Sequence, residues 1–549
     1  GRLAEVRAGD NEPSPNEIRR ALRDVIRHCI YGVDINPMAV ELCKVNLWLE
    51  SIEPGKPLSF LDAHIKCGNS LVGVGPGMNL EELEIPDEAF NPVTGDDKET
   101  AKLLKQCNKN ERAGQEDLFT VALIKSKEDL EHYLAKQSRV VEEMPEDEVM
   151  QVHAKAEAYY QLSGSAEFQR QRRIADMWTA AFFWEIEKTK GQNLQMVAPT
   201  QGQLRRLHRG SDTQPELLEK VHQLSLAENF FHFPLEFPDV AAQGGFDCAL
   251  GNPPWERIKL QEQEFFAARD PQIANAQNKA ARDRMIKALD ETNPPLAQAF
   301  KDAKHGAECS SKFARNSVRF PFSAVGDVNT YALFTEHFRS LINNQGRSGL
   351  IVPTGIATDD TLKDFFRDLT TTNSLSRLIG FENEEFLFSG IANVIRFCIL
   401  SLQPKTTVPN NATYVYYLRQ VNQIHQQERS FSLSAPDLAL LNPNTYTSPI
   451  FRTRVDATLT KAIYKRIPVL INENTKTNDW GVRYAGLFHM ANDSNLFHDN
   501  PGKGLLPLYE GKFFWHFDHR FGSYGIEGPG RGGRGLAVMP LSNYKNPNF

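Results

Sequence analysis

The spacing of apolar residues predicts a helix, a strand and a second helix near the start of the chain. Apolar side chains recur at helical intervals from Glu17 to Cys29, and a short apolar stretch, residues 30–33, ends at Asp34. Residues 39–49 again have helical spacing, and residues 63–65 predict another strand. A strand that ends at an acid and turns directly into a helix is typical of a βα unit in a parallel sheet.

The pattern changes from about residue 76 to residue 226. Pro and Gly are frequent up to about residue 95, and a long charged, helix-favouring region follows, with a largely apolar run from Ala175 to Trp184. Strand alternation is absent. We therefore expect a mostly helical insertion.

An α/β pattern returns after residue 230. Strands are predicted at 246–250, 349–353, 378–381 and 394–402, and helices at 331–342 and 360–369. Beyond Pro404 the chain is rich in loops and strand-favouring residues, and only residues 457–466 have helical spacing. The sequence thus predicts an α/β fold in four parts: 1–74, the helical insertion 75–229, 230–404, and a β-rich module 405–549.

Composition adds few constraints. The chain has 549 residues, of which 41% are hydrophobic and 24% charged, as in ordinary globular proteins of more than one domain. No apolar run approaches the ~18 residues of a membrane span. Seven cysteines without a Cys-x-x-Cys pair argue against a zinc ribbon or a disulfide framework and suit the reducing cytoplasm. No metal site is expected.

A net charge of −7 does not indicate nucleic-acid binding, but a large protein can confine its positive charge to one cleft. A group of basic residues follows residue 256 and would suit phosphate contacts, although nearby acids make a solvated helical face an equal alternative. These basic residues are Arg257, Lys259, Lys279, Arg282, Arg284 and Lys287.

The most informative motif is the peptide Asn252-Pro253-Pro254-Trp255, directly after the apolar strand 246–250. The amino group of adenine is a poor nucleophile, so its alkylation calls for acceptors on both amino hydrogens. An Asn side-chain oxygen and a backbone carbonyl supply them without a titrating group. Two prolines stiffen the turn, and Trp255 offers a stacking face for a flipped base. The alternative is a structural Pro-rich turn.

The chain resembles the amino-methyltransferases with an Asn-Pro-Pro-aromatic signature, in the large-methylase group that includes type IIG restriction enzymes. The order of the motifs is that of the gamma arrangement. The likeness implies a Rossmann-like, S-adenosylmethionine-dependent fold, an adenine-N6 DNA methyltransferase activity and a C-terminal target-recognition region. It also implies a place in restriction–modification or in phage defence of the BREX or DISARM kind. The residues that carry the likeness are Tyr31 to Leu49, Cys67 to Leu71, His232 to Ala267 and Leu508 to Tyr524.

By this resemblance, Asp34 would accept hydrogen bonds from the ribose hydroxyls of S-adenosylmethionine, and Ile35 would pack on its adenine ring. The alternative for Asp34 is a helix N-cap ahead of Pro37. Asn69 would contact the adenine amino group of the cofactor, with a simple Gly-Asn turn as the equal alternative, and Leu71 would be an apolar neighbour of the ring.

In the same resemblance, Asn252 and the Pro253 carbonyl hold the target amine, Pro254 keeps the turn rigid and Trp255 stacks on the base. A second aromatic residue closes the other face. Phe388 is the candidate, Phe386 is its rival, and a core role is the alternative for both.

The expected partners are double-stranded DNA and S-adenosylmethionine, with a nuclease domain or defence-system subunits as further partners, and no membrane. The Gly-rich loop that relatives carry before the first helix is absent ahead of Gly1-Arg2-Leu3, so we expect a fragment, truncated also within the recognition region. That region includes Tyr509-Glu510-Gly511-Lys512, Phe517-Asp518-His519-Arg520 and the Gly528–Gly535 loop with Arg531 and Arg534. Alternative functions are cytosine-N4 or protein-glutamine methylation, and a non-catalytic DNA-binding or assembly subunit.

Overall fold

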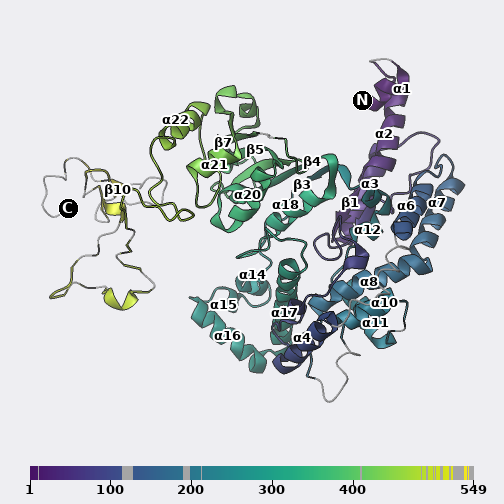
Figure 1. The fold of residues 1–549 in the computed structure, drawn as a ribbon, viewed down its shortest axis with the longest axis horizontal. Coiled ribbons are helices and arrows are strands. Elements are labelled where there is room, and N and C mark those ends of the chain that lie inside the picture. Colours follow the sequence, from purple (N-terminus) through teal and green to yellow (C-terminus); the bar gives the residue numbers. More distant parts are fainter. Residues whose placement is uncertain are drawn as a thin grey trace. The chain divides into compact units, whose positions relative to one another are not determined.

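Contacts between residues divide the chain into two units, Gly1–Asp479 and Trp480–Phe549, which are described separately. The computed structural model describes residues 1–9, 12–113, 128–188, 198–211, 213–408 and 411–483, and short stretches between 485 and 542. Figure 1 shows the fold with its main helices and strands labelled.

The βα unit predicted at the start of the chain is present. Strand β1 pairs in parallel with β2, and helix α3 connects them. Local signals start the two helices on either side of β1, because Ser14 and Glu17 form a capping box before α2, and the Asn36 side chain accepts the Met38 amide at the start of α3. The elements are α1 (Arg2–Ala8), α2 (Pro15–Cys29), β1 (Gly32–Asp34), α3 (Pro37–Glu50) and β2 (Ile65–Cys67).

Helices are the regular elements in the described part of residues 98–227, as the sequence predicted. Helix α8 is central, because its last turns are buried on all sides around Trp178 and Phe182. Short α12 and α13 lead from this region to the next strand. The helices are α4 (Lys98–Ala113), α6 (Glu128–Glu142), α7 (Val149–Ser163), α8 (Ala166–Phe183), α10 (Gln201–His208), α11 (Pro215–Ala227), α12 (Phe233–Glu236) and α13 (Pro238–Ala242).

Four further helices follow the strand after α13. The first three and the start of the fourth pack around a separate apolar cluster that includes Phe266 and Phe300. The end of the fourth, α17, joins the core around α8 through Phe313. These helices are α14 (Glu262–Ala267), α15 (Pro271–Ala274), α16 (Lys279–Thr292) and α17 (Pro294–Asn316).

A six-stranded mixed sheet has the strand order β3-β4-β6-β5-β7-β8. Strands β3 and β4 are parallel, as are β5 and β7, and the other neighbours are antiparallel. Helix α18 packs against β3 and β4 (Figure 1). The elements are β3 (Phe246–Gly251), α18 (Thr330–Leu341), β4 (Ile342–Pro353), α19 (Gly355–Thr358), α20 (Lys363–Thr371), β5 (Leu375–Glu382), β6 (Arg396–Leu402), β7 (Ala412–Leu418) and β8 (Phe431–Leu433).

Side chains alternate between the two faces of this sheet. Leu378 and Leu400 belong to the larger core, which α18, α20, α21 (Ala435–Leu441) and α22 (Arg454–Tyr464) cover. Ile379 and Phe397 point to the opposite face, where a smaller cluster includes Trp255 and Phe388. The period of two residues in the strands thus separates the two clusters, and Trp255 packs against both.

The module boundary expected at residue 405 is wrong. Strand β7 pairs with β5, its residue Tyr414 is fully buried, and the second unit begins only at Trp480. The Pro- and Asn-rich stretch after Pro404 suggested the end of a domain, whereas in the structure it connects two strands of one sheet. Residues up to 479 therefore belong with the sheet.

The second unit contains little regular structure in its described residues. Strands β9 (Gly522–Ser523) and β10 (Ala537–Val538) form an antiparallel pair, and Trp515 stacks on Phe521 with ring centroids 5.6 Å apart. Two short 3-10 turns, Ser494–Leu496 and Gly511–Phe513, precede them. None of the helices in the described ranges combines the length and apolarity that a membrane span requires.

Candidate functional site

The acid predicted at the end of β1 is exposed and well positioned by its backbone. Asp34 pairs with Cys67 across the two strands, and its carbonyl accepts the Gly68 amide at 2.9 Å. Its Oδ1 accepts the amide of Asn36 at 2.8 Å. Because Asn36 caps α3, the alternative role of Asp34 as the helix N-cap does not hold.

The next cofactor-site candidate, Ile35, directly follows Asp34 and is exposed. Ile35 is 54% exposed, so its side chain is accessible to a ligand. Its carbonyl lies 3.6 Å from the Cys67 sulfur. The parallel pairing of β1 with β2 thus brings the ends of both strands, and the residues that follow them, to one edge.

Asn69 and Leu71 follow β2 in a tight turn. The Asn69 side chain accepts the Leu71 amide at 3.2 Å, so the turn that the sequence offered as its alternative role is present. A carboxamide oxygen has a second lone pair and can accept another hydrogen bond. Leu71 is partly buried against the core around α8.

The loop after Leu71 runs beside residues 229–233. The amides of Phe231 and Phe233 donate to the carbonyls of Val72 and Val74, at 2.9 and 3.0 Å. At Gly73 the backbone has φ = 127°, and an added Cβ would lie 2.2 Å from the Phe231 carbonyl oxygen. Only glycine fits this close approach.

A buried arginine, which the sequence did not single out, holds the same loop from the other side. The Arg319 guanidinium donates to the carbonyls of Ser70 and Gly73, both at 3.1 Å, and lies 3.3 Å from Nδ1 of His337 on α18. Burial lowers the pKa of Arg319 to about 9, so the guanidinium stays charged at neutral pH. Burial and the Arg319 charge hold the pKa of His337 well below its ordinary value, which keeps His337 a neutral acceptor.

The Asn-Pro-Pro-Trp peptide leaves β3 as an irregular segment. Asn252 is exposed, and its side chain has no hydrogen-bond partner among the described residues, whereas Pro253 is buried. The Trp255 indole nitrogen donates to the carbonyl of Ile351 on β4, at 3.3 Å. The loop is therefore anchored at Trp255 and leaves the amide group of Asn252 free for an external partner.

The ring of Phe397 lies between Trp255 and Phe388. The Trp255 and Phe388 rings lie 6.5 and 5.0 Å from the ring of Phe397, which stacks on Phe381. Phe388 is partly buried there, and Asn383 bonds its amide and carbonyl at 3.0 Å each. Phe386 is 55% exposed. The structure thus brings Phe388, rather than its rival, to the face of the sheet that carries Trp255.

The basic residues after the loop differ in their surroundings. Arg257 lies 3.7 Å from Asp327, and Arg282 is largely buried, 3.8 Å from Glu262. Both charges are balanced locally, which weakens the case for these two as phosphate contacts. The recognition-region candidates Tyr509, Glu510, His519, Arg520, Arg531 and Arg534 lie outside the described residues.

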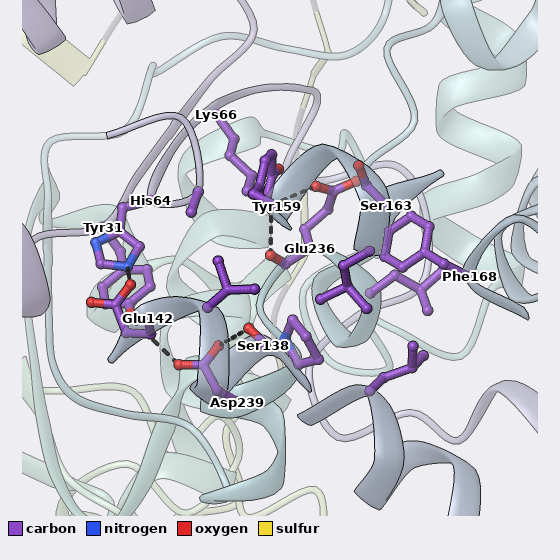
Figure 2. Close-up of a pocket in the computed structure, with 16 residues that line it drawn as sticks. Tyr31, His64, Lys66, Ser138, Glu142, Tyr159, Ser163, Phe168, Glu236 and Asp239 are labelled. Atoms are coloured by element: carbon purple, nitrogen blue, oxygen red, sulfur yellow. Dashed lines mark hydrogen bonds and ion pairs between the residues drawn. The ribbon is translucent and has the colours of Figure 1, made fainter. Parts of the chain in front are cut away.

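A cavity of about 40 Å³ lies next to β1 and β2, and none of the predicted site residues lines it (Figure 2). It is too small for a cofactor, since one water molecule needs about 10–15 Å³. The polar groups around it pair with one another: His64 with Glu142 at 3.1 Å, and Lys66 with Glu236 at 2.9 Å. This network attaches α6 and α12 to the start of β2.

Comparisons with known proteins find a family match over part of the chain. Residues 28–286 match the Eco57I restriction-modification methylase family, a range that includes Asp34, Asn69 and Asn252. A putative type II restriction enzyme and methyltransferase of Methanocaldococcus jannaschii, RM.MjaORFECS2P, is 21% identical over 418 residues. That alignment covers 71% of this chain and 27% of the relative, so the chain spans about a quarter of the relative's length.

Two solved structures give weak likenesses. The first, from work on assembly and conformational transition of the type I restriction–modification system, is 10% identical and aligns over 68% of this chain and 96% of its own. The second, the methyltransferase subunit of a type I system from Streptococcus thermophilus, is 9% identical and aligns over 79% and 98%. Both TM-scores are 0.21, too low to bear on the fold.

Proposed function

We propose that this chain is a DNA adenine-N6 methyltransferase of a restriction–modification or related phage-defence system. The observation that carries the proposal is Asn252, an exposed and unpartnered carboxamide at the end of β3, in a loop anchored through Trp255. It lies within the residues that match a restriction-modification methylase family.

The chemistry of the loop suits an amino group better than a hydroxyl or a carbon nucleophile. The Asn252 oxygen accepts one amino hydrogen and the Pro253 carbonyl accepts the other, which directs the nitrogen lone pair outward. Neither acceptor titrates near neutral pH. Trp255 on one face and Phe388 on the other stack on the base once it has left the duplex.

The end of the β1–β2 pair suits S-adenosylmethionine, which supplies an electrophilic methyl group when bound. The free Asp34 carboxylate oxygen would accept from the ribose hydroxyls, and exposed Ile35 would pack on the adenine ring. The second lone pair of the Asn69 oxygen would accept from the adenine amino group beside Leu71. An exposed acid beside an exposed large apolar residue fits a ligand with a polar sugar and an apolar ring.

The fold supports this assignment through its arrangement of sites. The parallel pair β1–β2 ends at the candidate cofactor residues, and strand β3 of the mixed sheet ends at the Asn252 loop. A Rossmann-like methyltransferase of the gamma arrangement has the same order, with the cofactor half first and the catalytic loop second. The region after the sheet, in particular Trp480–Phe549, would read the DNA target in this gamma arrangement. Double-stranded DNA is the partner, with a nuclease domain or subunits of a type IIG, BREX or DISARM system beside it.

The test is substitution of Asn252 by alanine, with the exposed Asn275→Ala as a matched control. We expect Asn252→Ala to abolish methyl transfer to DNA and to leave the affinity for S-adenosylmethionine nearly unchanged, whereas Asn275→Ala keeps both. Unaltered methylation by Asn252→Ala would exclude the assignment. Failure of the unsubstituted protein to bind S-adenosylmethionine, with DNA binding retained, would favour a non-catalytic assembly subunit.

A further inference from the structure

Residues 328–330 and residues 256–258 form a short antiparallel ladder beside the Asn-Pro-Pro-Trp loop. The Thr330 amide donates to the Glu256 carbonyl at 2.8 Å, and the Ile258 amide donates to the Val328 carbonyl at 3.1 Å. Between them Arg257 and Asn329 form an antiparallel bridge. The segment just after Trp255 is therefore fixed to the start of α18.

The Thr330 hydroxyl makes the contacts closest to the loop. Its oxygen lies 2.6 Å from the carbonyl oxygen of Pro254, to which it donates, and accepts the Glu256 amide at 3.1 Å. The Glu256 carbonyl oxygen lies 3.2 Å away as a weaker second acceptor. A hydroxyl has one proton and two lone pairs, so Thr330 uses its donor and an acceptor position on two successive peptide groups.

This contact determines how the Pro253 carbonyl is directed. Peptide groups are planar, and the ring of Pro254 fixes its φ, so ψ of Pro254 is the remaining soft torsion between the two peptide planes that flank it. A hydrogen bond to the Pro254 carbonyl holds that torsion. The peptide plane that contains the Pro254 carbonyl is attached to α18 by this bond. With ψ of Pro254 held, the preceding peptide plane, which contains the Pro253 carbonyl, also has a fixed direction.

We propose that Thr330 is a positioning residue for methyl transfer: its hydroxyl holds the Pro254 carbonyl, and so directs the Pro253 carbonyl toward the target amine. The inference rests on the function proposed above. Thr330 lies beyond the matched residues 28–286. It acts only through the loop and needs no contact with the base.

Three variants separate this role from a general effect on α18. Thr330→Val keeps the shape and removes the hydroxyl, and Thr330→Ser keeps the hydroxyl. Thr335→Val removes a buried hydroxyl from the same helix, where it donates to the Tyr331 carbonyl at 2.7 Å. Three quantities are measured on each protein: kcat for methylation of a DNA duplex, KM for S-adenosylmethionine, and the hydrogen-exchange rate of the Glu256 amide.

For Thr330→Val we expect kcat to fall about 10- to 100-fold, because small misplacements of reacting groups have effects of that size. KM for S-adenosylmethionine stays within about two-fold, and the Glu256 amide exchanges about ten-fold faster after losing its acceptor. Thr330→Ser restores kcat and the Glu256 exchange rate, and Thr335→Val leaves these two values near those of the unsubstituted protein.

Unchanged kcat and unchanged Glu256 exchange in Thr330→Val would overturn the proposal, as would an equal loss in Thr335→Val. Faster Glu256 exchange without any change in kcat would also overturn it, because the hydrogen bonds of the Thr330 hydroxyl to the loop would then have no part in catalysis. If the unsubstituted protein methylates no base while Thr330→Val still speeds Glu256 exchange, the proposed function fails, but the hydrogen bond between Thr330 and the loop is confirmed.

Discussion

The guanidinium of Arg319 donates a hydrogen bond to the carbonyl of Ser70, 249 positions earlier in the chain, at 3.1 Å. The same guanidinium bonds the Gly73 carbonyl and lies beside His337 on α18. Helix α18 begins at Thr330, which holds the Pro254 carbonyl. One helix therefore connects the loop of the proposed cofactor site with the loop of the proposed catalytic site.

Replacing Arg319 by methionine should weaken both the fold and the proposed cofactor site. Two carbonyl groups lose a charged donor, which costs about 2–4 kcal/mol in the free energy of unfolding. S-adenosylmethionine affinity should fall as well, because Ser70 adjoins Asn69 and Leu71. Denaturant titration and calorimetric binding measure the two effects. Arg315→Met is the control, because Arg315 donates to the Ala324 and Gly326 carbonyls instead; an equal loss of cofactor affinity in that variant would contradict the specific role.

Substitution of Gly73 by alanine should destabilise the protein far more than the same change at Gly77. Both have positive φ, but an added Cβ at Gly73 would lie 2.2 Å from the Phe231 carbonyl oxygen, while nothing lies within 4 Å at Gly77. We expect a loss of about 3 kcal/mol or more for Gly73→Ala and about 1–2 kcal/mol for Gly77→Ala. Equal losses in thermal or denaturant unfolding would mean that the loop does not approach Phe231 this closely.

Glu142 should make stability depend on pH in acid. Burial alone would raise the pKa of Glu142, but hydrogen bonds from His28 and His64 and the charge of Lys155 hold it well below its ordinary value of 4.5. The ionised group therefore stabilises the fold above pH 4.5, and this contribution disappears as the pH falls toward the lowered pKa.

The measurement is the denaturant midpoint of Glu142→Gln and of the exposed control Glu143→Gln between pH 7 and pH 3. At pH 7 we expect Glu142→Gln to be less stable by about 1–3 kcal/mol, with the difference from the unsubstituted protein shrinking below pH 4.5. A difference that stays constant over this range would show that the charge of Glu142 contributes nothing.

The two candidate aromatic residues can be separated by base-flipping fluorescence. Phe388→Ala should reduce the affinity for DNA with 2-aminopurine at the target position by about 1–3 kcal/mol, the usual value of one stacked base. Phe386→Ala should have little effect, since that ring is 55% exposed and outside the Trp255 cluster. The opposite ranking would assign the second stacking face to Phe386.

Local sequence patterns predicted the strands and helices that carry the site, but they contain no information on long-range contacts. The acid-ended strand before α3 and the strand before Asn252 are marked by short apolar runs, and both are present. Nothing adjacent in sequence marks Arg319 or Thr330, because their partners lie 249 and 76 positions away. The boundary after Pro404 was wrong for the same reason, since the pairing of β7 with β5 is not a local property.

The central claim is methyl transfer to the amino nitrogen of adenine at the Asn252 loop, and nucleoside mass analysis tests it most directly. Duplex DNA is incubated with the protein and S-adenosylmethionine carrying a labelled methyl group, digested and analysed for methylated nucleosides. We expect the label in N6-methyladenine with the unsubstituted protein and in no nucleoside with Asn252→Ala. Label in N4-methylcytosine, or equal label in N6-methyladenine with Asn252→Ala, would contradict the account.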